Sequence, residues 1–134
     1  MDTKNLIDSL VDTYRQLNIN FRGANDSAEA RSVVARMRDD EIAFSQALKD
    51  HITGIGTADG EENEVVDGAD RTLAQIISQF GTARATTLNL LKGLSDETAW
   101  SAQTSDGRSV REHVQDLVES DRNQLQKLGS LIGV

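Results

Sequence analysis

The chain has 134 residues and a net charge of −8, and it contains neither cysteine nor proline. The lack of cysteine excludes disulfides, thiolate metal sites and cysteine nucleophiles. The acidic charge, with only three Phe, one Tyr and one Trp, argues against a nucleic-acid partner, because phosphates would be repelled and bases would find few rings to stack on.

The length predicts a single domain over residues 1–134. No apolar run approaches the roughly 18–20 residues of a membrane span, so no membrane partner is expected. The first residues lack a basic region followed by an apolar one, which predicts no secretory signal and a cytoplasmic protein.

Because nothing but glycine interrupts the long stretches rich in Ala, Leu, Gln, Arg and Glu, we expect an all-α fold.

The first two predicted helices cover residues 2–22 and 26–54. Apolar residues recur in both at steps of three and four, the spacing of one helix face. Gly23 is expected to end the first helix in a left-handed conformation. Asp26, with Glu29 three residues on, is the expected amino-terminal cap of the second helix, which ends at Gly54.

Residues 54–68 form an acidic, glycine-containing stretch without a basic residue, which indicates a solvated connection. It is longer than a simple helical hairpin needs. Fully extended, such a stretch reaches on the order of 45 Å, enough to run the length of a helix. It therefore predicts a crossover between two parallel helices.

The third predicted helix covers residues 69–92 and ends at Gly93. Gly81 lies inside it at a cost of about 1 kcal/mol relative to alanine, which indicates the close approach of a neighbour. Residues 95–102 are expected to form a short turn that places Trp100 against one end of the helices.

The last predicted helix covers residues 107–134. Ser109 and Glu112 have the spacing of a capping box at its start. Its apolar stripe is broken at Asp121. Four amphipathic segments of this length predict a four-helix bundle with a long crossover between the second and third helices.

Four polar residues lie on these apolar stripes near the middle of their helices: Tyr14, Glu41, Arg84 and Asp121. Helices of similar length packed side by side bring their midpoints to one level, so we expect a buried polar layer. Buried charges persist when they are paired, and a guanidinium between two carboxylates meets that requirement. The alternative is that one or more of these side chains lie at the edge of a stripe and face solvent.

The two histidines give no metal signature. His51 lies near a helix end, where an imidazole interacts favourably with the helix dipole. His113 lies on the flank of the last stripe, and we place it, with Trp100, among possible neighbours of the polar layer. The two are far apart in the sequence without ligand spacing, so no metal and no cofactor is predicted. No local signature brings a serine, a histidine and an acid together for nucleophilic catalysis.

Four short motifs resemble the DinB/YfiT-like superfamily. They are VARMRDDE at 34–41, LSDETAW at 94–100, RSVRE at 108–112 and DLVESDR at 116–122. The resemblance extends over most of the chain. It implies a four-helix bundle in up-down-down-up order, with the crossover between helices two and three, and often a dimer.

Members of this superfamily typically hold a divalent metal with three histidines, one from the second helix and two from the fourth. The aligned residues are Arg36 on the second helix and, on the fourth, Asp116 and Ser120 or, in another register, Asn123 and Gln124. None is a histidine, and His113 lies one turn too early. The resemblance therefore implies a member of the superfamily without its usual ligands.

Two functions follow as expectations. The first is a metal-free bundle with a non-enzymatic role in binding or regulation, acting on a ligand or partner that the sequence does not identify. The second is a divalent-metal-dependent thiol S-transferase or isomerase that uses Glu41, Asp121 and His113 around a hard metal, although Arg84 in the same layer would oppose a cation. Whether the protein is an enzyme stays open at this point.

We also expect a homodimer formed through helix faces. The superfamily resemblance points to it, and so do apolar residues that flank the main stripes, namely Ile42, Ile76, Leu90 and Val118.

Overall fold

The computed structural model describes residues 3–23, 26–54, 71–94, 96–104 and 106–132. Within these ranges the regular structure is helical and there is no strand, which confirms the all-α class. The elements are α1 (Thr3–Gln16), a π-helical turn η1 (Leu17–Phe21), α2 (Ala28–Thr53), α3 (Leu73–Lys92), α4 (Glu97–Ser101) and α5 (Val110–Ile132). The predicted acidic connection lies mostly outside the described residues.

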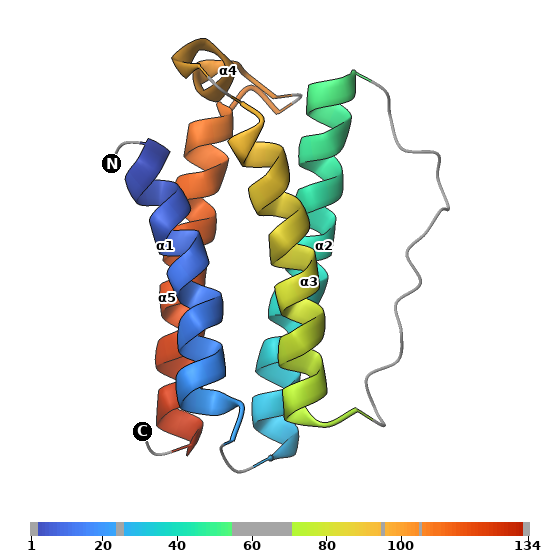
Figure 1. The fold of residues 1–134 in the computed structure, drawn as a ribbon, viewed down its shortest axis with the longest axis vertical. Coiled ribbons are helices and arrows are strands. Elements are labelled where there is room, and N and C mark those ends of the chain that lie inside the picture. Colours follow the sequence, from blue (N-terminus) through green and yellow to red (C-terminus); the bar gives the residue numbers. More distant parts are fainter. Residues whose placement is uncertain (1–2, 24–25, 55–70, 95, 105, 133–134) are drawn as a thin grey trace.

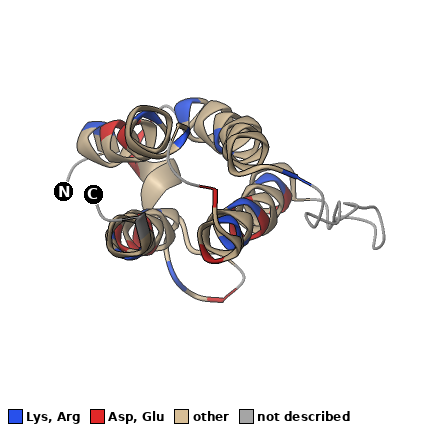
Figure 2. Ribbon diagram, turned by 90° about the horizontal axis from the view of Figure 1, so that it is seen from below, with Lys and Arg blue, Asp and Glu red and all other residues tan. Residues whose placement is uncertain are grey.

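The four long helices α1, α2, α3 and α5 lie side by side, and the short α4 lies at one end of them (Figure 1). The colours of Figure 1 show that α2 and α3 run in one direction and α1 and α5 in the other. Seen end-on in Figure 2, the long helices surround a common interior. No helix in the described part of the chain is long and apolar enough to cross a membrane.

The apolar interior consists of two clusters, one towards each end of the helices. The cluster nearer α4 includes Leu10, Leu91 and Val118. The cluster at the other end includes Leu17, Phe80 and Leu128. Each of the four long helices has at least one buried polar residue whose place in the sequence lies between the members of the two clusters. A polar level therefore divides the core.

Local hydrogen bonds fix most of the helix ends. The predicted capping box is confirmed, because Ser109 N donates to Glu112 Oε1 at 2.9 Å and Glu112 N donates to Ser109 Oγ at 3.1 Å. Gly54 ends α2, as predicted, and the structure adds that it does so with a left-handed φ of 73°. The predicted cap at Asp26 is wrong: Ser27 accepts from Ala30 N, whereas the Asp26 carboxylate accepts from the backbone N–H of Leu73, at the start of α3.

The end of the first helix also differs from the prediction. Gly23 has no positive φ, since the glycines with positive φ in the described residues are Gly54 and Gly107. Instead the last turn widens, and Arg22 N donates to Leu17 O at 3.0 Å. The widened turn ends the helix without a left-handed residue, and the Arg22 side chain then donates to Ser78 Oγ on α3 at 2.9 Å.

Two predicted features of tertiary packing are confirmed. A Cβ atom at Gly81 would lie 2.3 Å from Tyr14 Cζ, so the glycine allows the close approach of that ring. Trp100 is carried by the short helix α4 and is buried against the end of the long helices, where its Nε1 donates to Leu94 O at 3.1 Å.

The residues offered for a dimer face are partly used inside the protein. Ile76 and Val118 are buried in the two core clusters. Ile42 and Leu90 are half-buried. The expectation of a homodimer stays a prediction, and the first two residues no longer support it.

Candidate functional site

Arg84 on α3 lies at the centre of the polar level that divides the core. Its Nε donates to Glu41 Oε2 at 2.8 Å and its Nη2 to Glu41 Oε1 at 2.9 Å, a bidentate pair between α3 and α2. Its Nη1 and Nη2 donate to the two oxygens of Asp121 on α5, at 3.0 and 3.1 Å. The structure thus brings together three of the four residues that the sequence placed in the layer.

Helix α1 completes this layer through two groups. Arg84 Nη1 donates to the backbone carbonyl of Leu10 at 2.8 Å, and Thr13 Oγ1 donates to Asp121 Oδ2 at 2.8 Å. A guanidinium has five N–H donors, and each of them has an acceptor here. We use "polar layer" from here on for Thr13, Glu41, Arg84 and Asp121.

The polar layer is shielded from water. Arg84 and Glu41 are each 1% exposed and Asp121 is 5% exposed. Burial opposes the charge of Arg84, but its hydrogen bonds and charge interactions with Glu41 and Asp121 outweigh that effect and raise its pKa. Burial also raises the pKa of Asp121, against the opposing effects of Arg84 and Thr13. The layer is therefore a buried ionic network in which one guanidinium is paired with two carboxyl groups.

Tyr14 lies beside the polar layer. It is half-buried and packs over Gly81, its ring centroid is 6.4 Å from that of Phe80, and its hydroxyl accepts from Arg22 Nη2 at 3.4 Å. The side chain from α1 that bonds to the layer is Thr13. A signal for it existed, because Thr13 interrupts the series Leu6, Leu10 and Leu17 in the same way that Asp121 interrupts the stripe of α5.

The residues present do not fit the metal that the superfamily resemblance implies. Arg36 is 76% exposed and lies 3.8 Å from Asp40, and Asp116 is exposed and paired with Arg108. Glu41 and Asp121 are already bound to a fixed cation, which would repel a second one. Nowhere in the described ranges do three His, Cys, Asp or Glu side chains come together as a metal-binding group.

His113 lies in the first turn of α5, two turns before Asp121 and so about 12 Å away along the helix axis. It does not touch the polar layer, and neither does Trp100. Its Nε2 lies 3.1 Å from Thr104 Oγ1 and 3.0 Å from the Asp106 carboxylate. Both partners meet the same ring nitrogen, whereas a nucleophilic triad needs the hydroxyl and the acid on opposite nitrogens. This group therefore holds a loop and does not activate Thr104.

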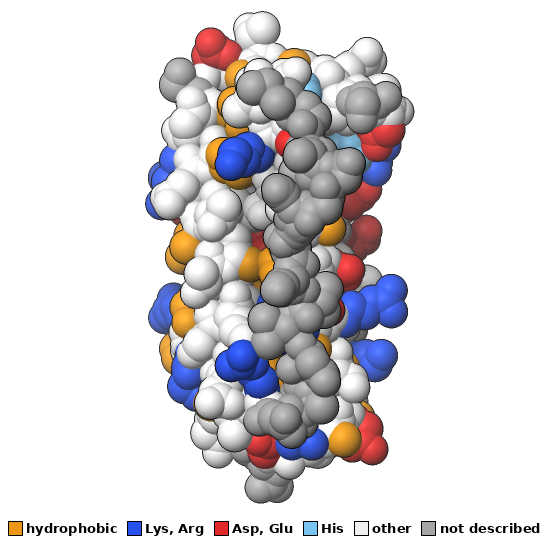
Figure 3. All heavy atoms as spheres, turned by 90° about the vertical axis from the view of Figure 1, so that its right-hand side faces the viewer, with side chains coloured by type: hydrophobic (Ala, Val, Ile, Leu, Met, Phe, Trp, Pro, Cys, Tyr) orange, Lys and Arg blue, Asp and Glu red, His pale blue; other side chains and the backbone are white. Residues whose placement is uncertain are grey.

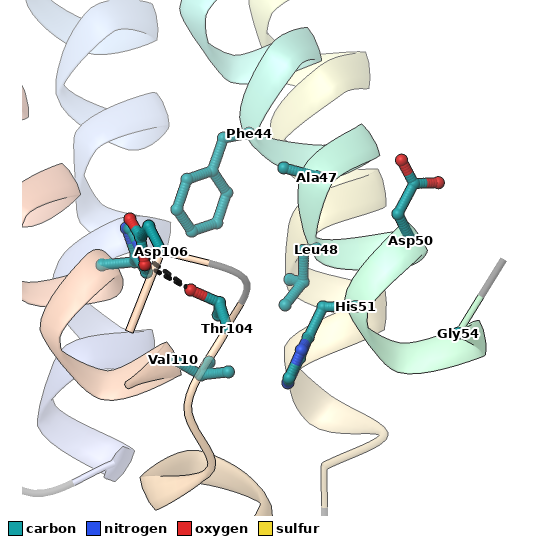
Figure 4. Close-up of a pocket in the computed structure, with 10 residues that line it drawn as sticks. Phe44, Ala47, Leu48, Asp50, His51, Gly54, Thr104, Asp106 and Val110 are labelled. Atoms are coloured by element: carbon teal, nitrogen blue, oxygen red, sulfur yellow. Dashed lines mark hydrogen bonds and ion pairs between the residues drawn. The ribbon is translucent and has the colours of Figure 1, made fainter. Parts of the chain in front are cut away.

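A cavity of about 550 Å³ lies between the carboxyl-terminal half of α2 and the loop that leads into α5 (Figure 4). Its walls include Phe44, Leu48 and Val110, and its polar groups include His51, Thr104 and His113. We call it the end pocket. Figure 3 shows histidine at the surface near this end of the molecule.

His51 was expected to serve only the helix end, and the structure adds that it lines the end pocket. Its half-buried ring has no hydrogen-bond partner among the described residues. In Figure 4 it extends from the last turns of α2 towards the side occupied by Val110. The sequence could not indicate this pocket, because its histidines come from helices far apart in the chain.

No protein-family model, no curated protein and no solved structure matches this chain. Its function must be inferred from its own residues.

Proposed function

We propose that this protein is a non-enzymatic binding protein built as a metal-free DinB-like four-helix bundle, and that its ligand is a small molecule held in the end pocket. The parallel course of α2 and α3 in Figure 1 supports the crossover bundle, because parallel neighbours need a long connection. The superfamily resemblance of the four motifs supports the same assignment.

The observation that carries the proposal is the end pocket itself. Small-molecule sites have volumes of roughly 300–1,000 Å³, apolar walls and a few convergent polar groups. The end pocket has about 550 Å³, walls from Phe44, Leu48 and Val110, and an imidazole at His51 that has no hydrogen-bond partner among the described residues. The polar layer does not offer such a site, because every donor of Arg84 is already used.

Binding is tested by adding a library of small fragments to ¹⁵N-labelled protein and following the amide resonances. We expect some fragments to shift the amides of residues 44–51 and 104–113 and few others. The variant Ala47→Trp places an indole at the rim of the end pocket and should abolish those shifts. Ala43→Trp is the matched control, because Ala43 is also exposed on α2 but does not line the pocket.

Two results would contradict this proposal. The first is a library in which no fragment shifts the amides around the end pocket, or in which Ala47→Trp and Ala43→Trp bind equally well. The second is a stoichiometric transition metal in the purified protein, which would contradict the metal-free assignment.

We also propose that the protein is a homodimer, with a two-fold contact between helix faces. The superfamily resemblance supports this, together with the half-buried Ile42 and Leu90. Light scattering at micromolar concentration should give twice the chain mass of 14.6 kDa. A monomer mass over that concentration range would refute the dimer.

A further inference from the structure

The charged side chains among the described residues that line the end pocket are acidic. They include the carboxylates of Asp50 and Asp106, and they include no lysine or arginine. In Figure 4, Asp50 points away from the centre of the cavity, so it acts from the rim. Among the described lining residues, a charged ligand therefore meets two carboxylates and neither lysine nor arginine.

The helix ends around the end pocket add to this field. The pocket lies at the carboxyl-terminal end of α2, where the helix dipole is negative and the last carbonyls lack intrahelical partners. The first turn of α5 has the opposite sign, but it already carries the Glu112 carboxylate of its capping box. The net field at the pocket is therefore expected to favour a cation.

Asp106 is held in its charged form. Hydrogen bonds from the Thr104 hydroxyl, the Arg108 backbone N–H and His113 lower the pKa of Asp106 well below its usual range. Its side chain is still 51% exposed, so it can accept from a ligand as well. The geometry of the loop thus presents a permanent anion to the pocket.

Two rings suit a cation with an apolar body. Phe44 lies on the pocket wall, and a ring face attracts a cation within about 6 Å of its centroid. His51 has no hydrogen-bond partner among the described residues, so a neutral imidazole there has a nitrogen available to accept an ammonium N–H. Leu48 and Val110 cover the remaining apolar surface of a small ligand.

From this arrangement we infer that the end pocket binds a small organic cation, an ammonium group on a compact apolar body, in preference to neutral or anionic molecules of the same shape. The inference rests on the proposed binding function and adds the chemical class of the ligand. The charges that attract an ammonium exclude a carboxylate from the same place.

Three probes with the same phenylethyl body test this class: 2-phenylethylamine, 2-phenylethanol and 3-phenylpropanoate. Their dissociation constants are measured by amide shifts of the wild-type protein at low salt. We expect the amine to bind at least tenfold more tightly than the alcohol, and the carboxylate to bind more weakly than either. Added salt should weaken binding of the amine and leave binding of the alcohol nearly unchanged, because salt screens partly exposed charges.

A pair of charge variants locates the effect. Asp106→Asn should weaken binding of the amine several-fold without changing the affinity for the alcohol. Glu119→Gln removes the same charge from an exposed site on α5 outside the pocket, and it should change the affinity for neither probe. If the alcohol or the carboxylate binds as well as the amine, or if library fragments bind but the amine does not, the cation inference is wrong while the binding function stands. If no fragment and no probe reaches the pocket, both fail.

Discussion

Replacing Arg84 by methionine is expected to lower the free energy of unfolding by about 3–5 kcal/mol at pH 8, the range seen when one partner of a buried ion pair is removed. The side chain of Arg84 is 1% exposed and pairs with both Glu41 and Asp121. Methionine fills much of the same volume without the charge. Two carboxylates would then face each other in an apolar interior without a counter-charge.

The loss should be smaller at pH 5. Without Arg84, burial and mutual repulsion raise the carboxylate pKa in the folded protein above its value in the unfolded chain, and at least one group takes up a proton. The folded state then binds more protons than the unfolded state, so the free energy of unfolding rises as pH falls through this range. Burial already raises the pKa of Asp121 in the presence of Arg84, which is the same direction.

Urea unfolding of Arg84→Met at pH 5 and pH 8 measures both effects. Arg36→Met is the matched control. The Arg36 side chain is 76% exposed, and its ion pair with Asp40 is long, at 3.8 Å, so this variant should lose no more than about 1 kcal/mol of unfolding free energy at either pH. Replacing Glu41, Arg84 and Asp121 together with apolar residues of similar size should cost much less than Arg84→Met, since no unpaired charge remains. A small loss that does not change with pH would contradict the ionic network.

Replacing Trp100 by alanine is expected to cost about 3–5 kcal/mol, as for other large buried aromatic side chains. Trp100 is 2% exposed, and the guanidinium carbon of Arg111 lies over its ring, 5.8 Å from the ring centroid. The five-residue α4 is too short to be stable alone, so its position depends on this contact. Trp100→Phe keeps most of the packing but loses the bond to Leu94 O, and should cost less.

Denaturant unfolding of Trp100→Ala gives the loss, and amide hydrogen exchange shows where it falls. We expect faster exchange in α4 and in the amides that bond across the following loop, such as Val110 N to Ala102 O. Thr98→Ala is the control, because Thr98 is exposed on the same short helix. A loss below about 1.5 kcal/mol for Trp100→Ala, or unchanged exchange around α4, would show that Trp100 does not hold this end.

Much of the local structure could be predicted because it depends on neighbours in the sequence. The apolar period marked all the long helices, and the reciprocal bonds of Ser109 and Glu112 involve residues three apart. The wrong prediction of a cap at Asp26 arose because two possible hydrogen-bond acceptors, Asp26 and Ser27, are adjacent in the sequence. Ser27 caps α2 because Asp26 is drawn to the start of α3, a partner that sequence spacing does not reveal.

The polar layer was predictable only in part. Charged residues in the middle of apolar stripes are rare enough to stand out, and the three that did, Glu41, Arg84 and Asp121, lie within hydrogen-bond distance of one another. Thr13 was missed because a threonine is small and weakly polar, although its place in the stripe of α1 marked it. The same reasoning from the apolar stripe chose Tyr14. Its ring instead packs against Gly81, beside the polar layer.

By itself, the sequence determined which segments are helical and where most of them end, because helix period and capping act on any chain with these residues. It also placed three charges on the apolar stripes, but it left open whether all of them face inward, and it is the packed helices that bring them together. Only the tertiary structure decided what surrounds the histidines. His51 and His113 line one pocket because α2 ends beside the turn at which α5 begins. That meeting depends on the direction and packing of whole helices, and no spacing along the chain records it.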